Sequence, residues 1–495
     1  ADDFGVDQTA PVVDAGTDKE TSVSVTQNAT ASDAGSSNIA TYLWTSHANV
    51  NFASAGTEDT DVSATTDGTY TLTLTVIDNA GNSTTDTATF VWDTTDPVLT
   101  AVTLVPTPTN DTSPSYTFSV DKAAWLVGNT GTINITGACG AWTPSAAQDG
   151  SNTITFTGPL ANAMYTDCDI TVTDFAGNSN AVALQINDFE VDTVAAVTNT
   201  AGITTEDTNT NGKIDTVTVV FDDPVDDSTF VASDFTVGGV TPTAVDTDGG
   251  VDDNTIVLVM GTEVDGTEAK TVSYTVGSAL DLAGNAIATF SYTSTDAAGP
   301  VLISARTITT TSIDAQFSED LNGATVNAGG SEFTVAGGTY AVSAAVEHVS
   351  DDGRVVLTVA TMPTDATPSV KFTNVDSFKD LNAVEAVSPV TVTAVDGVAP
   401  TLSAVHIASN NVKHPTTLAK ESNTVTLTFT SSEAIDPPVV TIGNESAGSV
   451  AGVGNDWTAT LVMDADDPEG AIAFTINFQD QAVPTPNVGT QVSTT

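Results

Sequence analysis

Short runs of alternating apolar and polar residues recur along the entire chain and are rich in β-branched residues. Residues 70–76, Tyr-Thr-Leu-Thr-Leu-Thr-Val, place an apolar side chain at every second position, which is the period of a strand with one buried face. Gly, Asp and Asn stand between such runs, where they favour turns. No run of convincing length has the period of an amphipathic helix, so we predict an all-β chain.

An aspartate followed four residues later by proline divides the chain at nearly regular intervals. The aspartates of this element are Asp7, Asp93, Asp296 and Asp396, with Asp192 at the matching position before Ala196. Successive members are 86 to 104 residues apart, a period that indicates tandem modules with a core each. We predict five modules with these bounds: residues 1–94, 95–192, 193–296, 297–396 and 397–495.

The composition narrows the classes of partner. Asp and Glu number 63 against 10 Lys and Arg, a net charge of −53, so the chain lacks the basic patches that bind nucleic acid or an anionic membrane surface. Either a halophilic or marine setting screens this charge, or divalent cations neutralise part of it, and the two can both hold. Hydrophobic residues make up 40% of the chain, which argues against disorder. No stretch of 18 apolar residues predicts a membrane span.

Two further acidic elements recur within the modules. A turn of pattern Asp-x-Ala-Gly-Asn begins at Asp78, Asp174 and Asp281, and it decays to sequences that keep the first aspartate at Asp380 and Asp480. In modules two to five an acidic residue also follows shortly after a strand that ends in Phe. These residues are Asp121, Asp223, Glu319 and Glu433.

Several segments resemble known domain families. Asp14-Ala15-Gly16, Tyr42-Leu43-Trp44 and residues 70–82 resemble PKD-type domains. The cysteine pair with residues 173–178, residues 221–225 and residues 440–443 resemble bacterial and archaeal Ig-like repeats of S-layer or adhesin type. This resemblance implies tandem antiparallel Ig-like β-sandwiches in an extended array, in an extracellular, cell-surface setting. In that setting we expect Cys139 and Cys168 to form a disulfide, with two buried thiols as the alternative.

The acidic elements are expected to meet at one end of each sandwich. In an Ig-type sandwich the linker that leads into the module, the loop after the second strand and the loop before the last strand share that end. Carboxylates gathered there repel one another unless they bind a cation, and Ca²⁺ accepts six to eight oxygens. The alternative is that each aspartate only caps a turn. The predicted groups are Asp93, Asp96, Asp121 and Asp174; Asp192, Asp223, Asp281 and Asn285; Asp296, Glu319 and Asp380; and Asp396, Glu433 and Asp480.

Residues 207–215 carry a more specific calcium pattern. Their sequence, Asp-Thr-Asn-Thr-Asn-Gly-Lys-Ile-Asp, resembles the first nine positions of an EF-hand loop. The resemblance assigns side-chain oxygens to Asp207, Asn209, Asn211 and Asp215, and a carbonyl to Lys213. Thr218 occupies the twelfth position, so Glu206 or Asp222 would have to supply the bidentate ligand. An Asn-rich turn without metal is the alternative, and residues 246–253 and 464–469 form weaker acidic loops of the same kind.

Other residues carry little chemistry. The four histidines are scattered, and no catalytic motif occurs, so we do not expect an enzyme. Trp44, Trp125 and Trp457 are expected to be core residues, with carbohydrate platforms as the alternative. Sequons for N-linked glycan stand at Asn28, Asn110, Asn134 and Asn444, with a less convincing one at Asn82.

These observations favour a cell-surface structural protein, an S-layer or filament component whose Ig-like modules are stiffened by Ca²⁺. We expect it to associate with copies of itself into a lattice or filament, without nucleic acid and without membrane insertion. A stalk that presents an adhesive tip outside this chain is one alternative. A carbohydrate-binding accessory array, with glycan as its ligand, is another.

Overall fold

The computed structural model describes residues 5–246, 252–275, 277–349, 351–375, 377–467 and 469–494, with the backbone alone at Asp351 and Asp352. The chain is all-β, as predicted. Its described part contains strands and five single turns of 3-10 helix: Thr200–Gly202, Asp227–Thr229, Ala232–Asp234, Gly323–Thr325 and Ala336–Gly338. No helix in the described part has the length and apolar character needed to cross a membrane.

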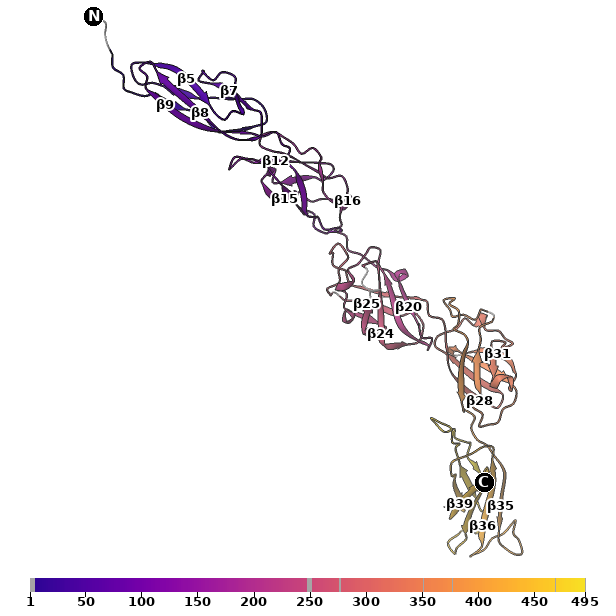
Figure 1. The fold of residues 1–495 in the computed structure, drawn as a ribbon. Coiled ribbons are helices and arrows are strands. Elements are labelled where there is room, and N and C mark those ends of the chain that lie inside the picture. The colour runs from indigo at the N-terminus through magenta and orange to yellow at the C-terminus, as the bar shows by residue number, and fades with distance from the viewer. Residues whose placement is uncertain are drawn as a thin grey trace. The chain divides into compact units, whose positions relative to one another are not determined.

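The described residues form five separate hydrophobic cores, and each core lies within one of the five predicted segments. We call the corresponding β-sandwiches modules one to five; they run from indigo to yellow in Figure 1. The modules group into two compact units. The first unit comprises Ala1–Ala195 with Leu280–Ala286, and the second comprises Ala196–Ala279 with Ile287–Thr495.

Module one shows how the alternating pattern becomes a sandwich. In β8 (Gly68–Asp78) the side chains of Leu72, Leu74 and Val76 are fully buried, while the threonines between them face outward, as the two-residue period requires. Trp44 of β5 completes this core. The four-stranded sheet has the order β2 (Lys19–Thr21), β9 (Ser83–Trp92), β8, β5 (Ile39–Thr45). Facing strands are β3 (Val25–Gln27), β7 (Thr60–Ala64), β6 (Val50–Phe52), and the pair β1 (Val12–Asp14) and β4 (Thr30–Ser32).

Module two has two four-stranded sheets and a short pair. The first sheet is β10 (Leu99–Thr103), β11 (Ser115–Val120), β15 (Gly150–Thr157), β13 (Ala141–Thr143). The second is β14 (Ala146–Ala147), β12 (Gly131–Thr136), β17 (Asp169–Thr173), β18 (Leu184–Gln185). The pair is β16 (Ala163–Tyr165) with β19 (Phe189–Val191). A disulfide joins Cys139 to Cys168, with 5.8 Å between their Cα atoms, and both cysteines lie in the core.

Modules three and four each contain one large sheet. In module three its order is β23 (Ala244–Asp246), β24 (Thr255–Asp265), β21 (Lys213–Val220), β20 (Ile203–Glu206), β27 (Thr295–Asp296), opposite β22 (Phe235–Val237), β25 (Thr271–Tyr274), β26 (Phe290–Thr293). In module four seven strands are connected in the order β30 (Phe333–Val335), β33 (Ser369–Phe372), β34 (Val390–Val395), β28 (Leu302–Thr309), β29 (Ser312–Phe317), β32 (Asp351–Val359), β31 (Val342–His348).

Module five returns to two sheets of four. The first is β35 (Leu402–Ser409), β36 (Thr424–Ser431), β40 (Asp456–Val462), β39 (Ser449–Val453). The second is β38 (Glu445–Ser446), β37 (Val439–Ile442), β41 (Phe474–Asn477), β42 (Val492–Ser493). In modules three and four the strand that leads out of the module, β27 or β34, runs parallel to an early strand. This pairing brings the aspartate at its end, Asp296 or Asp396, to the end of the sandwich.

Candidate metal sites at the module joints

Three carboxylates meet where module three leads into module four. We call Asp296, Glu319 and Asp380 the Asp296 cluster; one oxygen of each lies within 4.8 Å of the others. Asp296 ends β27, Glu319 follows β29, and Asp380 opens the turn that replaces Asp-x-Ala-Gly-Asn. All three side chains are buried. The three repeated acidic elements therefore converge here in space.

The Asp296 cluster is only partly satisfied by protein groups. The backbone N–H groups of Asn382 and Val384 donate to Oδ1 of Asp380, each at 2.8 Å. Oδ2 of Asp380 is buried and has no hydrogen-bond partner among the described residues. Burial raises the pKa of Glu319 to about 9, and the neighbouring charges of Asp296 and Asp380 act in the same direction. The site therefore disfavours three negative charges unless a cation joins them.

Module three also contributes to this joint. The hydroxyl of Thr267, fully buried, donates to Oε1 of Glu319 and lies 2.7 Å from the hydroxyl of Ser318. The loop of residues 207–215 approaches the same place, because a Cβ at Gly212 would lie 2.5 Å from Cγ2 of Ile303. Gly212 has φ +86°, which glycine adopts without strain. The calcium-like loop thus packs against module four beside the Asp296 cluster.

A second cluster repeats this arrangement where module four leads into module five. We call Asp396, Glu433 and Asp480 the Asp396 cluster; their oxygens also lie within 4.8 Å of one another. Asp480 accepts hydrogen bonds from the backbone and side-chain nitrogens of Asn487 at 2.7 and 2.8 Å. Oε1 of Glu433 is buried without a hydrogen-bond partner among the described residues. Burial, followed by the charges of Asp396 and Asp480, raises the pKa of Glu433 to about 7.

The predicted group at the joint between modules one and two does not form such a cluster. No three of Asp93, Asp96, Asp121 and Asp174 meet within 4.8 Å in the described structure. Asp96 and Asp121 are exposed, and the carboxylate of Asp174 is held by its own turn through Asn178. The physical reason lies at Asp93, where a lysine supplies the positive charge.

Lys122 and Trp125 of module two bind the buried carboxylate of Asp93. Nζ of Lys122 lies 2.9 Å from Asp93, and Nε1 of Trp125 donates to it at 2.7 Å. Glu20 of module one, 8% exposed, accepts bonds from the backbone N–H groups of Trp125 and Leu126 at 2.6 and 3.1 Å. We call this set the Lys122 latch. It joins the two modules through a protein cation.

The latch corrects the expectation that Trp125 is a core residue. Its side chain is 40% exposed, because its indole nitrogen reaches across to Asp93 and Lys122 lies 4.6 Å from its ring centroid. Trp44 is 2% exposed within the core of module one. Trp457 is half-buried and packs against the core of module five.

The predicted group around Asp192 is divided between the two units. Within the first unit Asn285 donates to Oδ2 of Asp281 at 2.9 Å and to the backbone oxygen of Asp192 at 3.1 Å. The carboxylate of Asp192 accepts the N–H of Val194 at 2.9 Å. Asp223 belongs to the second unit. The amide of Asn285 thus ties the turn to the linker.

One acidic cluster was not predicted. Asp7, Asp33 and Asp78 bring one oxygen each within 4.8 Å of the others at the start of module one. Asp7 and Asp78 belong to the two repeated elements, so the same argument applied to module one would have found them. Backbone hydrogen bonding from Thr9 lowers the pKa of Asp7. Their carboxylates accept bonds from local N–H groups, including those of Thr9, Gly35 and Asn82.

The loop of residues 207–215 closes on its own backbone. Asp207 accepts the N–H groups of Asn211 and Gly212, and Asp215 accepts those of Thr208 and Asn209. Lys213 forms an ion pair with Asp265 at 2.8 Å. The side-chain amides of Asn209 and Asn211 donate to Glu263 at 2.8 to 3.0 Å. Glu263, on β24, is the acidic neighbour that the sequence pattern did not reveal. Of the acidic loop at 246–253, residues 247–251 lie outside the described structure.

The four sequon asparagines are exposed. Asn28, Asn134 and Asn444 lie on the surface, whereas the amide of Asn110 donates to the backbone oxygen of Gly284 at 2.7 Å. Asn110 is therefore the least suited of the four to carry a glycan.

Comparison with known families identifies part of the chain. A family model of the PKD domain matches residues 15–91. Module one is a PKD domain. This result confirms the resemblance seen in the sequence, and no curated protein matches the chain.

Solved structures with tandem β-sandwiches are similar to the whole chain at a low level. A bacterial integrin-binding invasin matches at 14% identity and TM-score 0.30, over 98% of each chain. The human desmocollin-1 ectodomain matches at 12% identity and TM-score 0.22, over 91% of each. Surface layer protein SbsC, domains 4–9, matches at 13% identity and TM-score 0.19, over 99% of this chain and 81% of that one. Scores this low say nothing about what the chain binds.

Proposed function

We propose that the chain is a non-enzymatic, extracellular structural protein of the cell surface, an S-layer or filament component whose joints are stiffened by Ca²⁺. The PKD domain at its start, the Ig-like sandwiches after it and the disulfide of module two support this setting. The charge of −53 supports an environment of high salt or abundant divalent cations.

The observation that carries the proposal is the pair of buried, incompletely satisfied acidic clusters. Each brings together an aspartate of a linker, an acidic residue after a strand and an aspartate of a turn. Each also contains a buried carboxylate oxygen without a hydrogen-bond partner in the described structure, Oδ2 of Asp380 or Oε1 of Glu433. Burying such groups is costly unless a cation or a proton compensates them.

Calcium fits these donors better than the other common protein metals. The ligands are carboxylate oxygens, with no imidazole or thiolate among them, which favours a hard cation. Ca²⁺ also tolerates irregular geometry and takes additional oxygens from backbone carbonyls and water. The residues that would hold it are those of the Asp296 and Asp396 clusters.

The mechanical consequence follows from which elements the clusters join. Asp296 and Asp396 belong to the linkers, whereas the other two members of each cluster belong to the body of the following module. A cation held by all three fixes the linker to the module and removes the mutual repulsion of the carboxylates. Calcium therefore restricts bending at these two joints.

Small-angle scattering of the full chain in calcium and then in chelator tests the proposal. We expect a larger maximum dimension and a stiffer profile with calcium. The variant Asp380→Asn with Glu433→Gln should respond weakly, whereas Asp464→Asn with Asp466→Asn, which changes two exposed acidic residues, should respond like the natural chain. A profile that calcium leaves unchanged would contradict the proposal. Imaging of the native surface then separates a lattice or fibre from isolated projecting stalks.

A further inference from the structure

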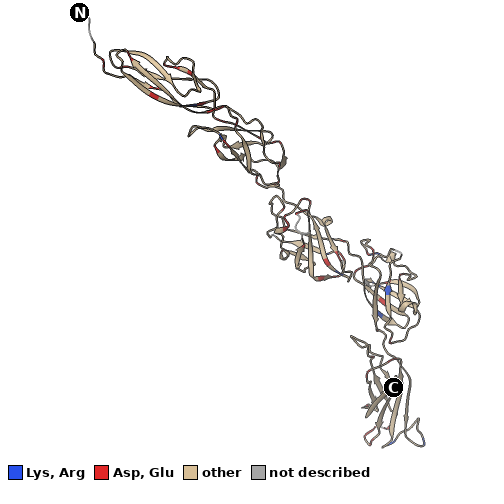
Figure 2. Ribbon diagram, viewed as in Figure 1, with Lys and Arg blue, Asp and Glu red and all other residues tan. Residues whose placement is uncertain are grey.

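The two arginines of the chain lie beside one hollow of module four. Among the ten Lys and Arg residues, Arg306 and Arg354 are the arginines. Arg306 lies on β28 and Arg354 on β32, and both line a cavity of about 440 Å³. Figure 2 shows this positive charge in module four against the acidic residues of the chain. Arginine differs from lysine in offering a planar set of N–H donors that matches a carboxylate.

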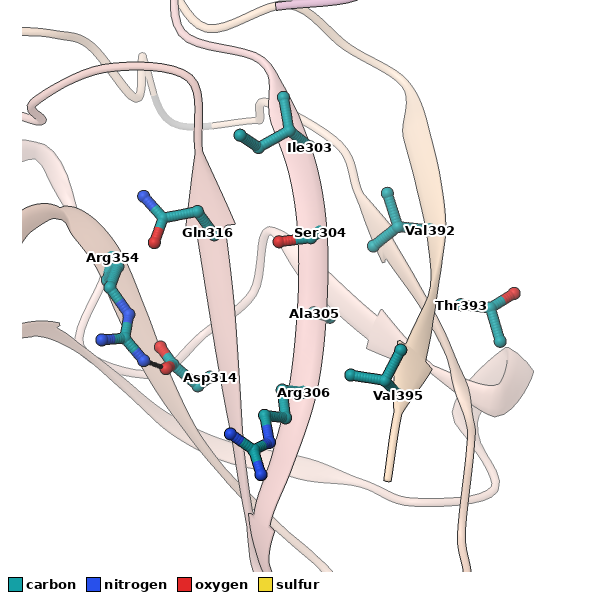
Figure 3. A pocket seen from close by; sticks show the side chains of 10 residues that line it. All are labelled: Ile303, Ser304, Ala305, Arg306, Asp314, Gln316, Arg354, Val392, Thr393 and Val395. Carbon is teal, nitrogen blue, oxygen red and sulfur yellow. Dashed lines mark ion pairs between the residues drawn. The ribbon is translucent and has the colours of Figure 1, made fainter. Parts of the chain in front are cut away.

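Arg354 is already committed to the protein. It forms an ion pair with Asp314 of β29, whose side chain is 5% exposed, and Figure 3 shows this pair beside the hollow. Because Asp314 neutralises Arg354, this pair contributes a fixed, polar wall.

Arg306 has donors to spare. Its side chain is exposed, and one nitrogen, Nη2, donates to Oδ1 of Asn487 at 3.0 Å. Among the described residues Asn487 is its one hydrogen-bond partner. A guanidinium carries five N–H donors, and Figure 3 shows that of Arg306 on the same side of β28 as Asp314 and Arg354. Asn487 thus holds the arginine in place and leaves most of its donors available to a ligand.

The remaining wall combines hydrogen-bonding and apolar groups. Ser304, Gln316 and Thr393 supply hydroxyl and amide groups, and Ile303, Val392 and Val395 supply apolar surface. The volume lies in the range of small-molecule sites. No aromatic residue is among the described residues that line it, so it lacks the stacking platform that a chain of neutral sugars would use.

The net charge of the protein limits the size of an anionic ligand. A polyanion, including a second copy of this chain, would be repelled by the charge of −53, whereas a ligand with one or two charges is repelled least. We propose that this hollow binds a small carboxylate ligand of about monosaccharide size. Its carboxylate pairs with Arg306, and its body lies against Ile303, Val392 and Val395.

Calorimetric titration of the full chain tests this site, with glucuronate, galacturonate and succinate as carboxylate probes and glucose as the neutral control. We expect saturable binding of at least one acid with a Kd in the millimolar range or below, and none of glucose. Arg306→Gln retains a donor for Asn487 but removes the charge, so binding should weaken at least tenfold. Lys371→Ala removes a charge from an exposed position of the same module outside the hollow and should leave binding unchanged.

Three results would overturn the proposal. They are no saturable binding of any acid, equal binding of glucose, and equal effects of Arg306→Gln and Lys371→Ala. Arg354 is left intact in these variants, because its removal would strand the buried charge of Asp314 and could unfold the module. The melting temperature of Arg306→Gln, compared with that of the natural chain, verifies that a loss of binding does not come from unfolding.

Discussion

Replacing Glu319 with Gln should stabilise the metal-free protein at pH 8, although it removes a native side chain. The pKa of Glu319 in the fold is about 9, against an ordinary value of 4.5. The folded state therefore binds the proton more tightly than the unfolded state. Stability from this group is full below pH 4.5 and falls as the pH rises towards about 9. Glutamine does not titrate and avoids this loss.

The linkage sets the size of the effect. Each pH unit between the two pKa values costs about 1.4 kcal/mol per proton. At pH 8 the natural chain without metal should therefore be less stable than Glu319→Gln by at most about 5 kcal/mol. At pH 4 the two should be equal. Calcium at 100 times its Kd should return about 2.7 kcal/mol to the natural chain, and much less to the variant, which lacks one of the three carboxylates.

Hydrogen exchange measured by mass spectrometry reports this effect locally, which matters because five modules do not unfold as one two-state system. The informative peptides cover Asp296, Glu319 and Asp380. Both proteins are compared at the same pH, with chelator and with calcium, so that intrinsic exchange rates cancel. Glu385→Gln is the matched control, because Glu385 is exposed in the same module. Faster exchange of Glu319→Gln than of the natural chain at pH 8 without metal would refute the reasoning, as would equal protection of both by calcium.

Three further changes test other parts of the structure. Gly212→Ala should weaken contact with Ile303 and lower the melting temperature more than Gly239→Ala, which has the same φ of +86° but no atom within 4 Å of its Cβ; equal losses would contradict the packing at that joint. Lys122→Met should cost about 2 kcal/mol by leaving buried Asp93 without its cation and should change Trp125 fluorescence, unlike Lys19→Met. Reducing the disulfide of module two should cost about 3–4 kcal/mol, seen as a shift of one calorimetric transition; an unmoved scan would show that the bond is dispensable.

The acidic clusters of modules four and five could be predicted because they depend on features that a sequence displays. The period of two assigned the strands, and the repeated aspartates marked the linkers and turns. In an Ig-type sandwich these elements share one end, so Asp296, Glu319 and Asp380 had to approach one another. The same logic covers Asp7 and Asp78, which were overlooked only because module one was left out of the comparison.

The Lys122 latch could not be predicted from these patterns. Lys122 directly follows Asp121, and a search for acidic residues passes over it. Its partner Asp93 comes from the preceding module, and Trp125 looks like a core residue until Glu20 is known to hold its backbone. Residues 207–215 fail for a related reason, because Glu263, which accepts from two of the loop amides, is more than 50 residues away in sequence.

The joints should therefore respond to different conditions. The Lys122 latch contains its own cation and gains nothing from calcium, but salt weakens its partly exposed pair. The Asp296 and Asp396 clusters hold an excess of negative charge that a proton or a divalent ion can relieve. Because burial raises the pKa of Glu319 to about 9 and that of Glu433 to about 7, near neutral pH calcium must displace a proton at the first cluster and less of one at the second. The Asp396 cluster should consequently bind calcium at a lower pH than the Asp296 cluster. Titrating calcium at pH 6 and pH 8 would reveal this order, and simultaneous saturation at both pH values would rule it out.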